Sequence, residues 1–133
     1  MTELKLELQE KSFTQLRDEF LAGSYDKVWE EHNLAMNELH NKLEDISGLI
    51  PMLESSNKHC QYVGAYIAAQ EGDGAASIFE YIFPLINSEC PEVRDEACDC
   101  FLNCTEDPLH YLGLLKLLED KEQSIRLRVI TIV

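Results

Sequence analysis

The stretch PLINSECPEVRDEACDCF, residues 84–101, decides the fold of this chain. An apolar segment gives way to a polar turn at residues 87–90, and Pro91 then opens a new amphipathic segment. Proline is favoured in the first turn of a helix because its missing N–H would have no partner there. The stretch therefore predicts the end of one helix, a short turn and the start of another.

The same arrangement recurs on both sides of this stretch. Pro51-Met52-Leu53-Glu54-Ser55 returns as Pro84-Leu85-Ile86-Asn87-Ser88, an offset of 33. Leu85-Ile86 with Val93-Arg94 returns as Leu117-Leu118 with Ile125-Arg126, an offset of 32. Such a period is typical of helical hairpins stacked as a solenoid. We expect helices at 57–70, 75–88, 91–103 and 107–120, and a last one from about residue 124.

Residues 1–56 predict two amphipathic helices ahead of these hairpins. Ser12 and Gln15 have the spacing of a capping box, and Gly23 stands where a helix would end. A second helix is predicted from Ser24 to about Ile46, because apolar side chains recur there every three or four residues.

The segments around Val93-Arg94 and Ile125-Arg126 resemble the signature of HEAT repeats. In that signature a leucine pair ends one helix, a short polar turn follows, and the next helix opens with an apolar residue and arginine. The resemblance covers about residues 50–133, with Cys60-Gln61 in place of the Val-Arg pair in the first unit and Val129 in place of a small residue in the last. It implies a right-handed α-α superhelix of HEAT-like hairpins, preceded by the two N-terminal helices.

Length and composition fit a single all-α domain. The chain has 133 residues, 45% of them apolar, and only 6 glycines and 4 prolines. One hydrophobic core is feasible at this size without metals or disulfides. We expect one domain over residues 1–133, with N-terminal helices in 1–56 and repeats in 57–133.

The formal net charge of -14 is the strongest compositional signal. Nucleic acid and anionic membrane surfaces are excluded as ligands, because there is no excess of Lys and Arg to neutralise phosphates. A basic partner protein is the expected complement, since opposite fields steer encounter. The charged N-terminus and the lack of an apolar run of ~20 residues predict a cytoplasmic protein. Its five cysteines are then expected to be free thiols.

An acidic stripe is predicted on the helix that begins at Pro91. Glu92, Asp95, Glu96 and Asp99 fall at i, i+3, i+4 and i+7, on one helical face. Residues 71–107 hold ten acidic side chains and one basic one. The stripe is either a solvated face of an acidic protein or a docking surface for a cationic partner.

Other candidate contact residues surround this stripe. Tyr62 and Tyr66 share a face one turn apart and suit either a contact surface or rim packing. The predicted partner-binding set is completed by four acidic residues of the turns, Glu71, Asp73, Glu106 and Asp107. Trp29 is predicted to pack between helices rather than to anchor a partner.

Catalysis and cofactor binding find little support. Cys98 and Cys100 point about 200 degrees apart on a helix, so they do not converge with Cys104 on zinc. No oriented third group or oxyanion loop accompanies a Cys–His pair. Carboxylates on one exposed face do not oppose each other across a pocket. A HEAT-like DNA glycosylase would need a basic channel, which the charge contradicts. We expect a protein without enzyme activity, metal or cofactor.

Compact, acidic, cytosolic HEAT-like proteins resemble the immunity proteins of bacterial contact-dependent and polymorphic toxin systems. The resemblance implies that an acidic face masks the basic substrate-binding surface of a nuclease toxin and inhibits it by occlusion. The docking charges would be Glu92, Asp95, Glu96, Asp99, Glu106 and Asp107. The alternative is a scaffold or adaptor fragment of a larger HEAT-repeat protein, which the uncapped apolar run Val129–Val133 favours.

Overall fold

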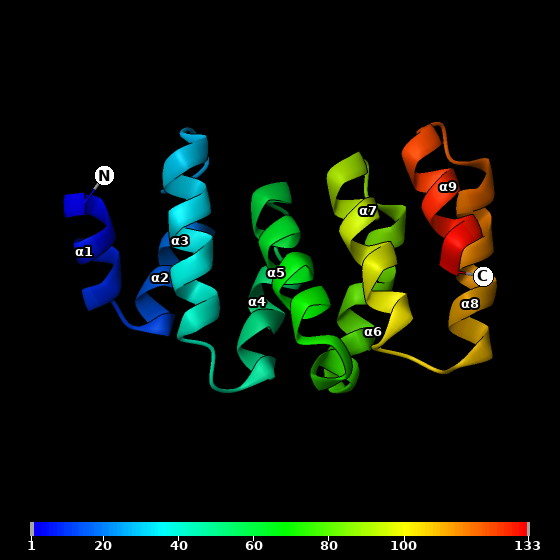
Figure 1. Cartoon of the computed structure of the whole chain (residues 1–133), viewed down its shortest axis with the longest axis horizontal. Helices are drawn as coiled ribbons and strands as arrows, with labels where there is room; N and C mark the ends of the chain where they lie inside the picture. Colours follow the sequence, from blue (N-terminus) through cyan, green and yellow to red (C-terminus); the bar gives the residue numbers. More distant parts are fainter. Residues whose placement is uncertain (1, 133) are drawn as a thin grey trace.

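Residues 2–132 are described in a computed structural model, and they form helices and turns without a strand. The helices stand in a row two layers deep (Figure 1). The nearer layer contains α3 (Trp29–Asn41), α5 (Lys58–Glu71), α7 (Pro91–Asp99) and α9 (Gln123–Ile132). The farther layer contains α2 (Phe13–Leu21), α4 (Ile50–Leu53), α6 (Phe79–Ile82) and α8 (Pro108–Leu114). The predicted all-α class is confirmed, and the HEAT-like superhelix stays a prediction.

Short 3-10 segments and one further helix complete the row. α1 (Thr2–Glu10) lies at its N-terminal end, against α3. The 3-10 segments are η1 (Ile46–Leu49), η2 (Gly72–Ile78), η3 (Phe83–Asn87), η4 (Cys100–Leu102) and η5 (Leu115–Glu119). No helix within residues 2–132 is both long and apolar enough to cross a bilayer.

Several helix ends form as the sequence predicts. Ser12 and Gln15 make both hydrogen bonds of the capping box at the start of α2, and Gly23 follows that helix with a φ of 82°. Pro91 occupies the first turn of α7. Asp107 caps α8 by accepting a hydrogen bond from the Leu109 N–H at 2.9 Å. These local signals set where most hairpins turn.

Several predicted helices differ from the structure. The helices expected over 91–103 and 107–120 pass into the 3-10 segments η4 and η5, and the helix expected from Ser24 to about Ile46 ends at Asn41. The helix expected from Ser24 begins only at Trp29, because Tyr25 turns inward onto Phe20, with ring centroids 4.8 Å apart, and donates to Glu19. The helix expected over 75–88 is divided into η2, α6 and η3. Pro84 lies in the first turn of η3, where its missing N–H interrupts the α-helical ladder.

The same pair of hydrogen bonds closes three successive turns. The side chains of Ser55, Ser88 and Asp120 each accept from the backbone N–H two residues later, at 3.0, 3.1 and 2.9 Å. The backbone carbonyls of these three residues each accept from a side chain six residues later, from Gln61, Arg94 and Arg126. The donors are 33 and 32 residues apart, so Gln61 takes the place of arginine in the first unit. We call this arrangement the turn clamp.

The turn clamp also ties neighbouring units together. Arg94 is 6% exposed, and its guanidinium pairs with both carboxylate oxygens of Asp120 at 2.8 and 3.0 Å. α3 begins at Trp29 and α5 at Lys58, so Asp26 and His32 stand relative to the start of α3 as Ser55 and Gln61 stand relative to the start of α5. The loop before α3 and the start of α3 are therefore related to the later units.

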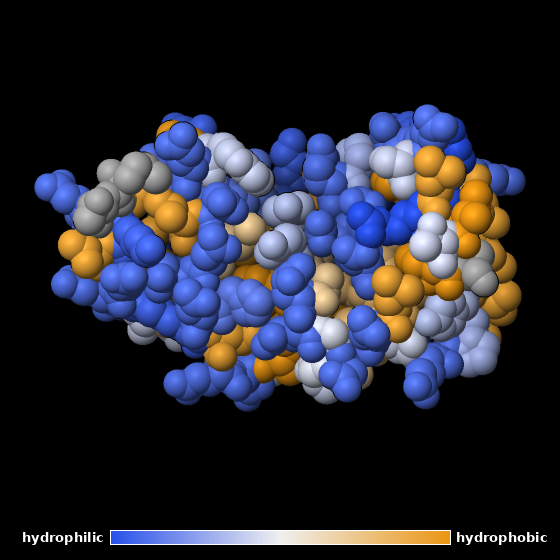
Figure 2. Space-filling model, in the orientation of Figure 1, coloured by the Kyte–Doolittle hydropathy of each residue, from blue (hydrophilic) through white to orange (hydrophobic). Residues whose placement is uncertain are grey.

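The core lies between the two layers along the whole row. Its largest fully buried side chains include Phe20 and Phe101, and Phe79 packs edge-on against Phe101 with centroids 5.0 Å apart. At the C-terminal end, apolar side chains of α8, η5 and α9 stay exposed, and Figure 2 shows them as orange atoms over these elements. This apolar end patch comprises Leu109, Leu112, Leu115, Leu118, Leu127 and Ile130.

Candidate functional site

A line of aromatic and imidazole rings crosses from α3 to α5 in the nearer layer. Trp29 stacks on His32, with centroids 5.5 Å and planes 13° apart. His32 lies 6.3 Å from Tyr62, and Tyr62 stacks with Tyr66 at 6.0 Å. His59 flanks the line, 6.0 Å from His32. The predicted pairing of Tyr62 with Tyr66 is part of a longer aromatic surface.

A pocket of about 380 Å³ lies at the Trp29 end of this line. Its walls come from the loop before α3, the first turns of α3 and α5, and the start of α7. They are formed by Asp26, Lys27, Trp29, His32, Lys58, His59, Tyr62, Cys90 and Glu92. Trp29 is 66% exposed, so the prediction that it packs between helices is wrong. An exposed tryptophan beside a pocket is the kind of side chain that anchors partners.

His32 is buried in this pocket without a hydrogen bond. The residue is 4% exposed, and neither Nδ1 nor Nε2 has a partner within residues 2–132. Burial lowers the pKa of its imidazole, and His59 lowers it further, while Asp26 opposes them. The ring is therefore neutral near pH 7, with one N–H donor and one acceptor nitrogen.

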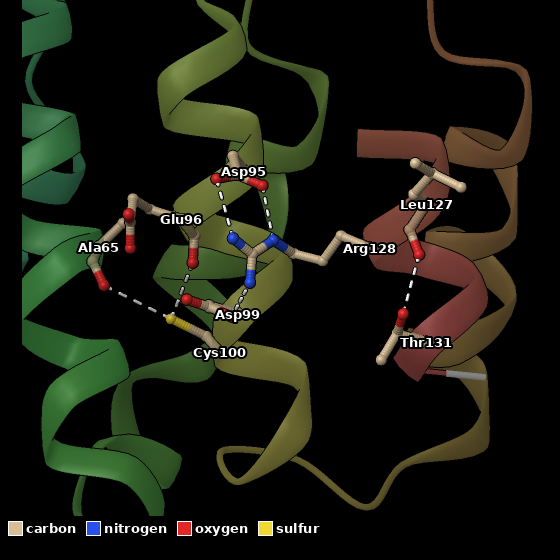
Figure 3. A network of polar contacts seen from close by, with 8 residues as sticks. All are labelled: Ala65, Asp95, Glu96, Asp99, Cys100, Leu127, Arg128 and Thr131. Carbon is tan, nitrogen blue, oxygen red and sulfur yellow. Dashed lines mark hydrogen bonds and ion pairs between the residues drawn. The ribbon is translucent and has the colours of Figure 1, made fainter. Parts of the chain in front are cut away.

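The acidic stripe on α7 is divided by Arg128 of α9. Figure 3 shows the guanidinium between Asp95 and Asp99. Arg128 donates to both carboxylate oxygens of Asp95 at 2.6 and 3.1 Å and also to Asp99. Two of the four carboxylates of the predicted stripe, Asp95 and Asp99, are therefore paired within the chain. Arg128, which lies on the next helix of the nearer layer, neutralises part of the charge of these two carboxylates.

Glu96 points away from Arg128, toward α5 (Figure 3). Burial raises the pKa of its carboxyl to about 7, with a further rise from Asp99 and Asp95, and Arg128 opposes these effects. Burial also raises the pKa of the Tyr62 hydroxyl, and the charge of Glu96 adds to that rise. Tyr62, in the line of aromatic rings, and Glu96 thus lie close together between α5 and α7.

Glu92 is the member of the stripe that borders the pocket. It lies in the first turn of α7, and the Cys90 thiol donates to its Oε2 at 3.1 Å. This hydrogen bond lowers the pKa of the Glu92 carboxyl. The structure therefore gathers six of the predicted residues on one surface, the aromatic–acidic face: Tyr62, Tyr66, Glu92, Asp95, Glu96 and Asp99.

The other four predicted residues lie at the opposite end of the nearer helices, in the lower turns of Figure 1. Glu71 is at the end of α5, with its carboxylate 3.5 Å from His40 Nε2. Asp73 is in η2, and Glu106 and Asp107 precede α8. They form a separate acidic edge, and Asp107 is occupied as a helix cap.

The sequence-based prediction missed the pocket residues Asp26, His32, Lys58 and His59. A signal was present, since Trp29 and His32 are three residues apart and His59 and Tyr62 repeat that spacing on the next helix. Residues at this spacing share a helix face. The pairing of the two faces depends on how α3 and α5 stack, which no local pattern reveals.

The cysteines serve packing. All five are free thiols, and Cys60, Cys98, Cys100 and Cys104 are buried. The Cys60 thiol donates to the Phe20 carbonyl, and the Cys104 thiol to the Gly72 carbonyl, both at 3.1 Å. Within residues 2–132 no three His, Cys, Asp or Glu side chains gather as metal ligands would.

Comparisons with protein-family models, with curated proteins and with solved structures find no match to this chain.

Proposed function

We propose that this protein is a binding module that neutralises a basic partner protein by occlusion, as an immunity protein does with a nuclease-type toxin. The observation that carries the proposal is the exposed Trp29, aligned with the Tyr62–Tyr66 pair beside the carboxylates of α7. Tryptophan and tyrosine dominate the binding energy of protein interfaces because they bury a large rigid surface.

Charge supports the choice of a basic partner. The chain has 25 acidic side chains against 11 Lys and Arg, and ion pairs with Lys or Arg among the described residues engage only five carboxylates: Asp18, Glu19, Asp95, Asp99 and Asp120. The remaining negative field would attract a cationic surface from a distance and favour fast association. Internal pairing of Asp95 and Asp99 and the burial of Glu96 move the expected contacts toward the exposed Glu92 and the rings.

Co-expression with a basic domain, if a neighbouring gene encodes one, tests the proposal. We expect the chain to protect cells from that domain and to bind it tightly. Replacing Trp29 and Tyr62 together by alanine should weaken affinity at least about 100-fold, since each is placed as an anchor. Leu102→Ala is the matched control, because Leu102 is also exposed (54%) but lies outside the face. Unprotected cells, or a double variant that binds as tightly as the wild type, would refute the proposal.

The apolar end patch supports a second candidate, a scaffold or adaptor unit of a HEAT-like assembly. Six large apolar side chains gathered at one end form the kind of surface that another helical subunit covers. Leu112→Lys with Ile130→Lys should abolish assembly with such a subunit and leave binding at the aromatic–acidic face unchanged. If the double variant also loses binding at the aromatic–acidic face, the substitutions have unfolded the protein. If it still assembles with the subunit, this candidate is wrong.

A further inference from the structure

The pocket beside Trp29 contains buried polar atoms without partners. Both ring nitrogens of His32 and Oδ1 of Asp26 make no hydrogen bond within residues 2–132. Both residues line the pocket, and only 4% of His32 is exposed. Buried polar groups in folded proteins nearly always have partners, so unpaired ones require an explanation.

Comparison with the related turns makes the exception clear. Gln61, Arg94 and Arg126 occupy the position of His32 in the later units, and each donates to the carbonyl six residues earlier. His32 makes no such bond. Asp26 corresponds to Ser55 and Asp120, but its Oδ2 accepts from the Asn57 side chain at 3.0 Å and its Oδ1 is free within residues 2–132. The turn before α3 thus lacks the side-chain hydrogen bonds that close the three later turns.

The chemistry of these groups selects a donor. Asp26 is acceptor-only when ionised, and the neutral His32 ring offers an acceptor nitrogen. A carboxylate in the wall of the pocket would repel an anion. Lys27 and Lys58 are exposed at the rim, and the charge of Lys58 acts on Glu92 there. The unpaired atoms of Asp26 and His32 therefore favour a ligand rich in N–H groups.

The walls favour a planar cation. The Trp29 indole and the Tyr62 ring both border the pocket, and aromatic faces attract cations, tryptophan most strongly. Guanidinium also stacks on aromatic rings and forms two parallel bonds to a carboxylate. Trp29 is 66% exposed, so part of its indole is accessible to a ligand although it stacks on His32. A guanidinium in the pocket would have both an aromatic wall and a carboxylate among its neighbours.

We propose that this pocket receives an arginine side chain of the basic partner, bonded to Asp26 and stacked on Trp29. The proposal rests on the proposed function for its partner and adds which side chain the face recognises. It predicts that recognition depends on one positive, planar group rather than on net charge alone.

The single tryptophan of the chain provides the assay, since fluorescence then reports on Trp29 alone. The probe is a blocked glycyl-arginyl-glycine tripeptide, and its neutral isostere contains citrulline in place of arginine. We expect a saturable fluorescence change with the arginine peptide and at least about tenfold weaker binding of the citrulline peptide, because charge-assisted hydrogen bonds are the stronger kind.

Two variants distinguish binding in the pocket from attraction by the overall negative charge of the protein. Asp26→Asn retains an oxygen for Asn57 and should weaken the arginine peptide about tenfold. Glu80→Gln removes the same charge from an exposed site on α6 and should have no effect. Circular dichroism checks folding, and Glu92→Gln, at the pocket rim, replaces Asp26→Asn if that variant unfolds.

Equal binding of both peptides, or no loss in the carboxylate variants, would overturn the pocket assignment. If the tripeptide has no effect while Trp29→Ala with Tyr62→Ala still loses the partner, the pocket assignment fails and the protein-binding face stands. If that double variant retains partner binding, the proposed function fails instead.

Discussion

Glu96→Gln should stabilise this protein, although it removes a charge from an acidic surface. The carboxyl lies on α7 between Asp95 and Asp99 and faces Tyr62, and its pKa is raised to about 7, mainly by burial. Glutamine keeps the shape of the side chain and carries no charge. The substitution therefore removes the unfavourable burial of an ion and little else.

The magnitude follows from the pKa. A rise from 4.5 to about 7 corresponds to about 3 kcal/mol at most. Partial exposure reduces this value, so we expect Glu96→Gln to raise the free energy of unfolding by about 1–2 kcal/mol at about pH 8. Between about pH 4.5 and 7 the folded protein retains a proton that the unfolded chain has lost. The stabilising effect should therefore shrink as pH falls and vanish near pH 4.

Urea denaturation of both proteins at about pH 8 and about pH 4 measures this difference. Glu80→Gln is the control, because Glu80 is exposed on α6 and should change stability little at either pH. A Glu96→Gln protein that is no more stable than the wild type at the higher pH would refute the burial argument. An equal gain at both values would show that charge is not its cause.

Three further predictions concern the fold. Arg94→Met leaves a carboxylate of the turn clamp buried without its partner and should cost about 3–5 kcal/mol in urea denaturation; a loss below about 1 kcal/mol would contradict a structural ion pair. Burial lowers the pKa of the His32 imidazole, so on acidification the unfolded chain binds a proton before the folded protein does. His32→Leu should therefore reduce the fall in the free energy of unfolding between about pH 7 and pH 5 by about 1 kcal/mol. An unchanged pH profile would refute this. Gly113→Ala would place a Cβ 2.5 Å from the Phe83 ring and should lower stability by about 1–3 kcal/mol, whereas Gly74→Ala, whose Cβ would meet no atom closer than 3.9 Å, should not; equal thermal midpoints for the two variants would contradict it.

Local patterns were sufficient for the class of the fold and for many helix ends. The capping box at Ser12, Gly23 and Pro91 each act through atoms a few residues away, so sequence spacing alone identifies them. Tyr25 shows where this reasoning stops. Its ring extends the apolar period of the predicted helix, yet it packs on Phe20 by leaving the helical path. Local periodicity does not distinguish these two ways of burying a ring.

The candidate site could be predicted only in part. Tyr62 and Tyr66 share one helix, and their pairing follows from helical geometry. The pairing of Arg128 with Asp95 joins residues 33 apart, close to the period of the repeated pattern. Such a contact depends on the stacking of α9 on α7 and on the rotamer that bridges them. The acidic stripe was therefore visible in the sequence, but its internal counterion was not.

The turn clamp has a consequence for how the length of such a chain can change. Each clamp is built from atoms no more than six residues apart, so it carries its own geometry wherever the segment is placed. Excising a stretch from Ser56 through Ser88 would bring Ser55 to the position before Glu89, six residues ahead of Arg94. The spliced joint would contain every donor and acceptor of an ordinary turn. Insertions or losses of whole periods are thus the changes this architecture absorbs most readily, while a shift of two or three residues would separate donor from acceptor.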